Sequence, residues 1–196
     1  MARPKEFDRD EALERALKLF WEKGYEATSI GDLVNAMGVQ RQSLYDTFGD
    51  KHGLFRAALE RYGQLRAERL QSMECEIAPG GSSLAKLRRV FRALTSSSGP
   101  DDRGCLVINS AVERGLVDEA VAEHAKASVN GLERLFATLI LEAQQAGEVP
   151  KTTSPKTAGR LLVTIFWGLG ALGRALPDAA WQRSVVDGAL GLIAKP

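Results

Sequence analysis

Apolar residues recur every three or four positions along most of this 196-residue chain, which is the spacing of helices that bury one face. We find no run of alternating apolar and polar residues long enough to indicate a strand. The pattern therefore predicts an all-α fold of about nine or ten helices. The predicted helices span residues 8–24, 28–38, 40–49, 54–77, 83–97, 104–113, 118–146, 155–176 and 178–193.

Start and stop signals lie at the ends of these segments. Asp8 with Glu11 has the spacing of a capping box, and so has Ser29 with Asp32. Gly38 is expected to end the second helix, because glycine adopts the left-handed conformation at little steric cost. All seven prolines lie at predicted boundaries or at the termini, at positions 4, 79, 100, 150, 155, 177 and 196. A proline inside a helix costs about 3 kcal/mol, so this placement supports the assignment.

Residues 28–49 indicate two short helices joined by a tight glycine turn. Four apolar residues at helical spacing mark the first of them: Ile30, Leu33, Val34 and Met37. In the second, Leu44 and Phe48 lie one turn apart and are expected to be buried. This arrangement is typical of a helix-turn-helix, whose second helix can enter the major groove of DNA.

This stretch resembles the DNA-binding segment of the TetR family of transcriptional regulators. The matching residues are Thr28, Ile30, the turn Ala36-Met37-Gly38-Val39, Ser43-Leu44-Tyr45, Phe48-Gly49, Asp50-Lys51 and Leu54-Phe55. They cover roughly residues 10–56, about a quarter of the chain. The resemblance implies a three-helix helix-turn-helix DNA-binding domain over residues 1–53 and a helical ligand-binding and dimerisation domain over residues 54–196.

The resemblance also implies a function. Proteins of this family mostly repress transcription, bind a palindromic operator as homodimers, and are released when a small molecule binds the larger domain. The expected partners are therefore double-stranded operator DNA, a second copy of the chain and a small-molecule effector whose identity the sequence does not give.

The second short helix exposes five polar residues that could meet DNA: Arg41, Gln42, Ser43, Tyr45 and Thr47. Arginine forms bidentate hydrogen bonds to guanine and glutamine forms them to adenine, so Arg41 and Gln42 are the expected base readers. The resemblance implies phosphate contacts for Thr28, Tyr45 and Lys51.

The N-terminal arm carries two further cations, Arg3 and Lys5. They could follow the phosphates or enter the adjacent minor groove, as arms of some helix-turn-helix proteins do. A frayed terminus without function is the alternative.

Three residues depart from the family pattern. Gln40 stands where relatives usually have a Ser or Thr cap, and a glutamine cap is weaker by about 1 kcal/mol. Asp46 and Thr47 replace residues that are often basic or aromatic. Asp46 would repel phosphate, although it could accept a hydrogen bond from a cytosine amine. These departures bear on which operator sequence is read.

Charge gives no independent support for DNA binding, since the net charge of the chain is +1. Residues 1–56 hold nine Lys and Arg against ten Asp and Glu. A DNA-binding surface must therefore come from the placement of the cations. Two cysteines are too few for a disulfide framework, no leader-like segment precedes the first helix, and the longest uncharged run, 161–173, is shorter than the roughly 20 residues of a membrane helix. The protein is expected in the cytoplasm.

Six residues of the larger domain are candidates for an apolar ligand pocket with a polar anchor: Met73, Phe91, Cys105, Asn109, Phe136 and Trp167. Aromatic and methionine residues at helical spacing are equally typical of an ordinary core, and that alternative stays open. Cys105 has two interpretations of its own. It could be a small apolar residue on a buried helix face, or a thiol that senses oxidants or electrophiles, with Arg103 and the helix start lowering its pKa.

The run 167–173, Trp-Gly-Leu-Gly-Ala-Leu-Gly, is unusual for a helix, because each interior glycine costs up to about 1 kcal/mol relative to alanine. Close approach of another helix at a subunit interface would explain it. Together with residues 129–140, it predicts a four-helix dimer contact.

No enzyme signature is present. His52 and His124 lie in no catalytic or metal-binding motif, and we find no phosphate-binding glycine loop, nucleophile elbow or metal-spaced Cys/His set. We therefore expect no catalytic residues, no metal site and no cofactor. A helical protein-interaction module without DNA binding remains as the alternative function.

Overall fold

The computed structural model describes residues 7–75, 82–95, 104–172, 175–176 and 178–194. These residues form nine helices and no strand, so the all-α prediction is confirmed. The helices are α1 (Arg9–Lys23), α2 (Ile30–Met37), α3 (Arg41–Phe48), α4 (Lys51–Cys75), α5 (Ser83–Thr95), α6 (Leu106–Arg114), α7 (Glu119–Gln145), α8 (Pro155–Leu172) and α9 (Ala179–Ile193).

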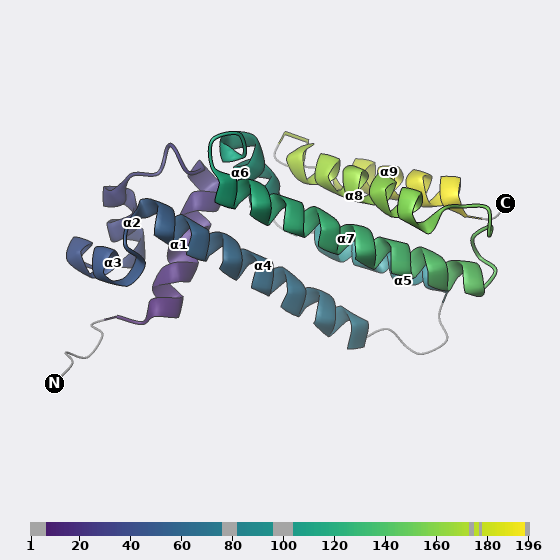
Figure 1. The fold of residues 1–196 in the computed structure, drawn as a ribbon, viewed down its shortest axis with the longest axis horizontal. Coiled ribbons are helices and arrows are strands. Elements are labelled where there is room, and N and C mark those ends of the chain that lie inside the picture. The colour runs from purple at the N-terminus through teal and green to yellow at the C-terminus, as the bar shows by residue number, and fades with distance from the viewer. Residues whose placement is uncertain (1–6, 76–81, 96–103, 173–174, 177, 195–196) are drawn as a thin grey trace.

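The molecule is elongated, with its two ends built from different helices (Figure 1). Helices α1–α3 form one end, which we call the head. Helices α5, α7, α8 and α9 form the other, which we call the body. Helix α4 leads from the head along the body, and α6 lies where the two meet. No helix among the described residues is long and apolar enough to cross a membrane.

Local capping explains the start of the helices in the head. Ser29 and Asp32 form the predicted capping box: the Ser29 hydroxyl accepts from the Asp32 N–H at 3.0 Å, and the Asp32 carboxylate accepts from the Ser29 N–H at 3.0 Å. Asp8 caps α1 by accepting from the Asp10 and Glu11 amides. The predicted box at Asp8 is corrected, because the Glu11 carboxylate pairs with Arg15 at 2.5 Å.

Some predicted boundaries were wrong by a few residues. Helix α4 starts at Lys51 rather than at residue 54, because the Asp50 carboxylate caps it by accepting from the Gly53 N–H at 2.7 Å. Helix α6 starts after Cys105, which is its N-cap and not an interior residue. Helix α8 ends at Leu172, not at residue 176.

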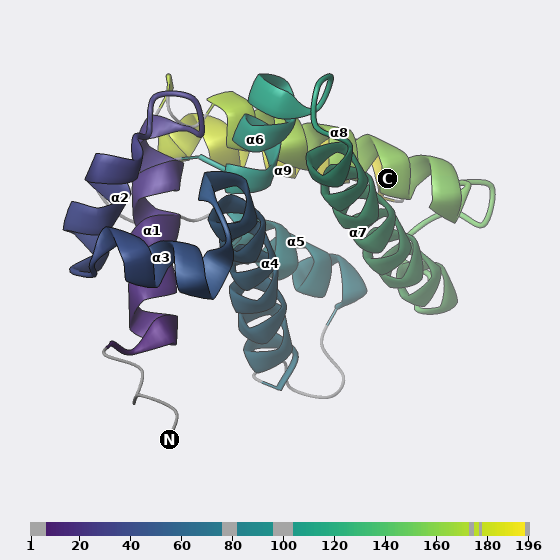
Figure 2. The same cartoon turned by 60° about the vertical axis from the view of Figure 1, so that its left-hand side comes forward.

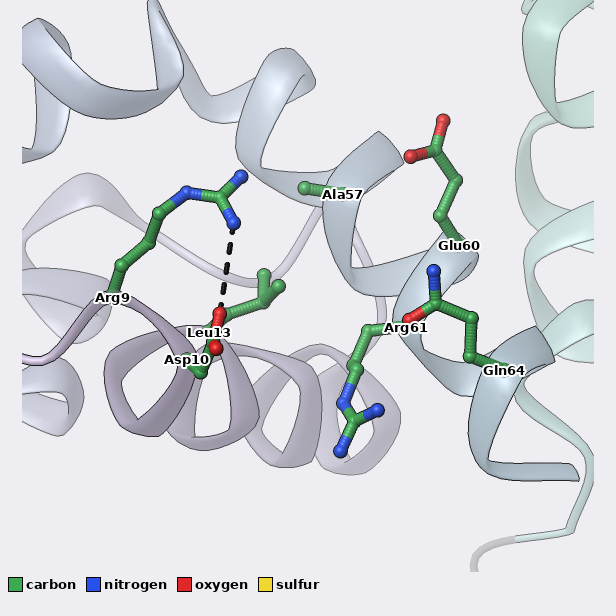
Figure 3. Close-up of a pocket in the computed structure, with 7 residues that line it drawn as sticks. All are labelled: Arg9, Asp10, Leu13, Ala57, Glu60, Arg61 and Gln64. Atoms are coloured by element: carbon green, nitrogen blue, oxygen red, sulfur yellow. Dashed lines mark ion pairs between the residues drawn. The ribbon is translucent and has the colours of Figure 1, made fainter. Parts of the chain in front are cut away.

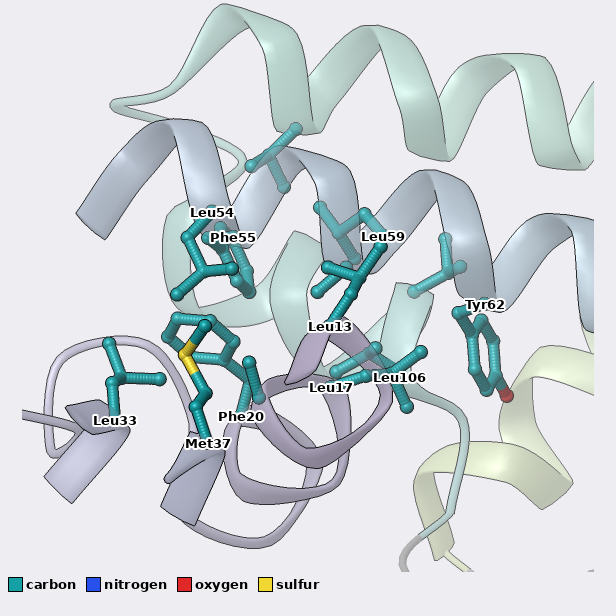
Figure 4. Close-up of a cluster of buried hydrophobic side chains, with 14 of the residues drawn as sticks. Leu13, Leu17, Phe20, Leu33, Met37, Leu54, Phe55, Leu59, Tyr62 and Leu106 are labelled. Atoms are coloured by element: carbon teal, nitrogen blue, oxygen red, sulfur yellow. The ribbon is translucent and has the colours of Figure 1, made fainter. Parts of the chain in front are cut away.

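The core of the head extends into the first half of α4 and into α6. Phe20 of α1, Leu33 of α2, Leu44 of α3, Phe55 of α4 and Leu106 of α6 are all buried in one cluster. Figure 4 shows α1, α2, α4 and α6 side chains converging there. The predicted domain boundary between residues 53 and 54 thus falls inside α4, and the division of roles on its two sides stays a prediction.

The body has a second core, centred on the antiparallel pair α7 and α8. Phe136 of α7 is fully buried and stacks on Phe91 of α5, with ring centroids 5.1 Å apart. The pair packs closely at Gly159, where a Cβ atom would lie 3.0 Å from the Glu133 carbonyl oxygen. Trp167 contacts both this core and that of the head.

Candidate nucleic-acid interface

Helix α3 is anchored by one fully buried residue and by Phe48, which was expected to be buried and is half-buried against the same core. Leu44 is fully buried, whereas Arg41, Gln42 and Asp46 are exposed. A turn that ends α2 at Gly38, with φ of +69° and ψ of +34°, directs the chain into α3. In Figure 2 α3 is the foremost helix of the head and no other described helix lies in front of it. The helix is therefore accessible to a duplex.

The two predicted base readers are each held by a neighbour one turn along α3. Gln42 Nε2 donates to Asp46 Oδ1 at 2.8 Å. The Arg41 guanidinium donates to the Tyr45 hydroxyl at 3.3 Å and lies 5.8 Å from the Tyr45 ring centroid. These contacts restrict the side chains before DNA arrives, and base edges would have to replace or share them.

Asp46 thus orients Gln42 through this hydrogen bond, a role for Asp46 that was not predicted from the sequence. The signal was available, because residues four apart on a helix are neighbours and Gln–Asp pairs at that spacing are stabilising. Gln40 is the N-cap of α3 but makes no side-chain capping hydrogen bond, which agrees with its expected weakness.

Lys51, the predicted phosphate contact, is half-buried at the start of α4. Its Nζ lies 4.2 Å from the centroid of the Tyr25 ring. The Gly53 amide is already bonded to Asp50, so it is not free to bind a phosphate at this helix start. Ser43, Tyr45 and Thr47 are half-buried on α3, beside the exposed readers.

Thr28 requires a correction. It is fully buried, and its hydroxyl donates to the Gly24 carbonyl at 2.6 Å. The side chain closes the turn between α1 and α2 instead of facing a duplex, because its only proton is used within the head. Arg3 and Lys5 lie outside the described residues.

Arg9 adds a cation near α3 that the sequence analysis missed. Its guanidinium lies 5.3 Å from the centroid of the Phe48 ring, at the end of α3. No sequence signal links these residues, because they are on different helices and far apart in the chain.

The candidate ligand residues do not gather around one described cavity. Phe91 and Phe136 are fully buried and stack on each other, so we correct their assignment from pocket lining to core. Asn109 is half-buried on α6, and the Met73 side chain lies outside the described residues. The Trp167 indole Nε1 is buried and has no hydrogen-bond partner within the described part of the chain.

Cys105 is buried beside a cation and a phenol. Its sulfur accepts from Arg66 Nη1 at 3.6 Å and lies 3.8 Å from the Tyr62 hydroxyl. Burial, followed by the neighbouring Cys105, raises the pKa of Tyr62 to about 12, so this phenol stays protonated. The predicted cation, Arg103, lies outside the described residues, and Arg66 of α4 contacts the sulfur.

A polar pocket of about 230 Å³ lies elsewhere, between α1 and α4. Figure 3 shows Arg9 and Asp10 of α1 across from Glu60, Arg61 and Gln64 of α4. None of the six candidate ligand residues lines this pocket. No three His, Cys, Asp or Glu side chains in the described segments are grouped so that they could hold a metal ion.

Comparison with known families agrees with this geometry over both parts of the chain. Residues 12–58 match the family model described as bacterial regulatory proteins, tetR family. Residues 83–187 match the model described as tetracyclin repressor-like, C-terminal domain.

Individual relatives extend the match along most of the chain. The HTH-type transcriptional repressor ComR of Escherichia coli is 36% identical over 174 residues, which is 88% of this chain and 82% of ComR. The uncharacterized HTH-type transcriptional regulator YezE of Bacillus subtilis is 38% identical over 76% of each chain.

Solved structures share the fold. A cysteine mutant of the TetR family regulator CifR, complexed with 26 bp double-strand operator DNA, is 31% identical with a TM-score of 0.80, covering 98% of this chain and all of that one. A TetR family regulator from Agrobacterium tumefaciens has a TM-score of 0.83 at 20% identity, covering 95% of this chain and 97% of its own, and shows the fold alone. The chain belongs to the TetR family of transcriptional regulators, which are DNA-binding proteins and not enzymes.

Proposed function

We propose that this protein is a repressor that binds a palindromic operator as a homodimer and is released by a small-molecule effector. The observation that carries the proposal is the solvent-facing α3, anchored by Leu44 and presenting Arg41 and Gln42. The relative ComR is described as a repressor, and the cysteine mutant of CifR is complexed with operator DNA, which supports this choice. Operator binding would require the protein to be in the cytoplasm, with the DNA.

We assign the base contacts to Arg41 and Gln42, and contacts to the DNA backbone to Ser43, Tyr45, Thr47 and Lys51. Arg3 and Lys5 would extend the contacts beyond the described head. Residues 1–53 would then bind DNA, and residues 54–196 would bind the effector and the second subunit.

The dimer contact is assigned to α8 and α9. Leu161 and Leu172 of α8 and Trp181 and Leu192 of α9 are large apolar side chains exposed on the single chain. A Cβ atom at Gly168 would meet nothing within 4 Å, so that side of α8 has room for close approach by a partner helix. Residues 129–140 of α7, predicted to join this contact, instead supply Phe136, Leu139 and Ile140 to the core of their own body. Two subunits joined in this way would each place one α3 in a major groove, with the two grooves about one helical turn or a multiple apart on the same face of the DNA.

For the effector, we retain Trp167, Cys105 and Asn109 as candidate contacts. The unpartnered Trp167 Nε1 favours a ligand that carries a hydrogen-bond acceptor. An effector shifts the equilibrium toward the DNA-free state of the protein. The size of this shift is limited by the ratio of the effector's affinities for the DNA-free and DNA-bound states.

Mutation of the head tests the proposal. Arg41→Ala should cost about 1–3 kcal/mol of binding at its base and relax sequence preference there, because a bidentate contact is lost. Lys51→Ala should weaken all sequences about equally and reduce the salt dependence by about one counterion. Fluorescence anisotropy with duplexes from the DNA upstream of the gene, at several salt concentrations, measures both.

Two outcomes would reject this assignment: no salt-dependent binding to any duplex, as a protein-interaction module would give, or binding unchanged in both variants. A strictly monomeric protein that still binds the operator tightly would reject the homodimer.

The same scaffold with a thiol input is a second candidate function. The 3.6 Å contact between Arg66 and the Cys105 sulfur favours it, because reactive cysteines typically lie beside cations. Under this alternative, oxidant weakens operator binding by the wild type and not by Cys105→Ser. An equal response of the two proteins excludes Cys105 as the sensor.

A further inference from the structure

Two segments that are far apart in the sequence meet beside the start of α4: the α1–α2 turn, residues 24–29, and the end of α6 with the turn that follows it, residues 113–118. The carboxylate of Glu113 accepts from the backbone N–H groups of both Tyr25 and Glu26, each at 2.9 Å. Arg114 pairs with the Glu26 carboxylate. The end of α6 therefore holds the backbone of the α1–α2 turn directly, through contacts that do not involve α4.

The close contact between the α1–α2 turn and Glu113 restricts which residue can stand at position 24. A Cβ atom added at Gly24 would lie 3.0 Å from both carboxylate oxygens of Glu113, at a backbone φ of +83°. The turn thus passes so close to Glu113 that only glycine fits there without strain.

The Tyr25 ring connects this turn to a proposed DNA contact. Its centroid lies 4.5 Å from the Arg114 guanidinium carbon and 4.2 Å from Lys51 Nζ. Cations are attracted to the face of an aromatic ring at such distances. Phe55 packs against the same ring, with centroids 4.8 Å apart, and so restricts the position of the Tyr25 side chain.

A second contact holds the start of α4 to the same α6–α7 turn. His52, the residue after Lys51, places its Nε2 at 2.8 Å from Asp118 Oδ2. Asp118 is 7% exposed, caps α7 at Val121 and lies 3.7 Å from Arg114. Burial raises the pKa of Asp118, but the Val121 amide, His52 and Arg114 together outweigh burial and lower it, so the carboxylate is charged at neutral pH.

We infer that Glu113, Arg114 and Tyr25 are positioning residues that fix Lys51 at the start of α4, so that the end of α6 controls the phosphate contact by a route that does not run along α4. The inference rests on the proposed function in taking Lys51 as a phosphate contact.

The opposite end of α6 lies among residues of the body, which makes the helix a direct link. The Cys105 N–H donates to the Gly170 carbonyl of α8 at 3.3 Å. A Cβ atom at Gly170 would lie 3.0 Å from the Ile108 side chain, so α6 and α8 are in close contact there. A displacement of α8 relative to α6 would therefore reach Glu113 and, through Tyr25, Lys51.

A double-mutant cycle tests the link in the full-length protein. Tyr25→Leu removes the aromatic face and should weaken operator binding about two- to five-fold, whereas Tyr25→Phe keeps the ring and should stay near the wild type. In the Lys51→Ala background, Tyr25→Leu should cause no further loss. An equal loss in both backgrounds, or none with Lys51 present, overturns the inference, because Tyr25 would then act through packing alone or not at all.

A measurement on the free protein separates this inference from the proposed function. The ring current of Tyr25 should shift the Lys51 ε-methylene protons upfield in the NMR spectrum. Glu113→Gln, which leaves one backbone N–H without its acceptor, should reduce that shift, whereas the control Glu119→Gln, an exposed residue of α7, should not. A shift unchanged in Glu113→Gln rejects the positioning role even if the operator is bound. A reduced shift without operator binding supports the link and rejects the proposed function.

Discussion

The N-termini of α2 and α5 are both capped by a carboxylate, but the carboxylates come from different distances along the chain. In the head, Asp32 lies three residues from Ser29, and the two cap α2 between them. In the body, Glu148 accepts from the N–H groups of Ser83 and Leu84 at 3.1 and 2.8 Å, although it follows α7 and lies 65 residues from Ser83. Neighbouring residues alone cap α2 in the head, whereas in the body Glu148 supplements a local cap, the Ser82 hydroxyl, which accepts from the Ala85 N–H at 3.2 Å.

This difference indicates how each region acquires its structure. The start and end of α2 are determined by a few consecutive residues, so the helix can begin to form before the rest of the chain is in place. At the start of α5, the N–H groups of Ser83 and Leu84 gain their carboxylate acceptor only after Glu148 has packed beside them. We therefore expect the stability of the body to depend mainly on the packing of its core. The stability of the head should depend more on contacts between neighbouring residues.

The largest expected effect tests that dependence. Phe136→Ala should lower the free energy of unfolding by about 3–5 kcal/mol, because it removes a fully buried ring that stacks on Phe91. Urea unfolding followed by circular dichroism, at fixed protomer concentration, measures it. The control Val112→Ala changes a side chain that is 82% exposed and should stay within about 0.5 kcal/mol. A cost below about 1.5 kcal/mol would instead indicate open space around Phe136, as an effector pocket requires.

A smaller effect is expected where the head relies on a local stop signal. Gly38→Ala should cost about 1–2 kcal/mol, because φ is +69° and a side chain is strained in the left-handed region. Gly31→Ala is the matched control within the same helix. Its Cβ would make only an ordinary contact of 3.6 Å with Ser29 Oγ, so it should stabilise by about 0.5–1 kcal/mol. Equal and same-sign changes would show that the left-handed turn does not determine where α2 ends.

The same contrast explains what the sequence could predict. The Ser29–Asp32 box and the Gly38 stop are decided by neighbours in the chain, and both were predicted correctly. Sequence patterns also placed the nine helices to within a few residues and indicated the outward-facing α3.

Contacts between distant segments could not be predicted in this way. Glu113 looks like an ordinary surface glutamate, and nothing in its surroundings names the Tyr25 amide as its partner. Phe91 and Phe136 were predicted as pocket residues because an aromatic side chain at helical spacing fits a pocket and a core equally well. Only the packing of α5 on α7 distinguishes the two.

The smallest expected effect concerns how the stabilising contributions of the Asp32 and Glu148 carboxylates change as the pH falls. The Ser29 backbone N–H, then the Ser29 hydroxyl and Lys23, lower the pKa of Asp32 from 3.8 to about 2. Burial raises the pKa of Glu148, but the Leu84 N–H, the Ser82 hydroxyl and the Ser83 N–H outweigh it, so this pKa is lowered too. A carboxyl whose pKa is lower in the folded protein stabilises it above the unfolded pKa, and that contribution is lost as the pH falls through the folded value.

Asp32→Asn should therefore be less stable than the wild type by a constant amount above about pH 5, and this gap should close as the pH falls from 4 toward 2. Glu148→Gln should behave in the same direction, with its gap closing below about pH 4.5. Urea midpoints measured from pH 7 to pH 2 follow both gaps. Hydrogen exchange then distinguishes the regions: exchange should quicken at the Asp32 amide in Ser29→Ala and at the Leu84 amide in Glu148→Gln. If Glu148→Gln leaves the Leu84 amide protected, the cap of α5 does not depend on the distant carboxylate, and the contrast between head and body fails at the contact that defines it.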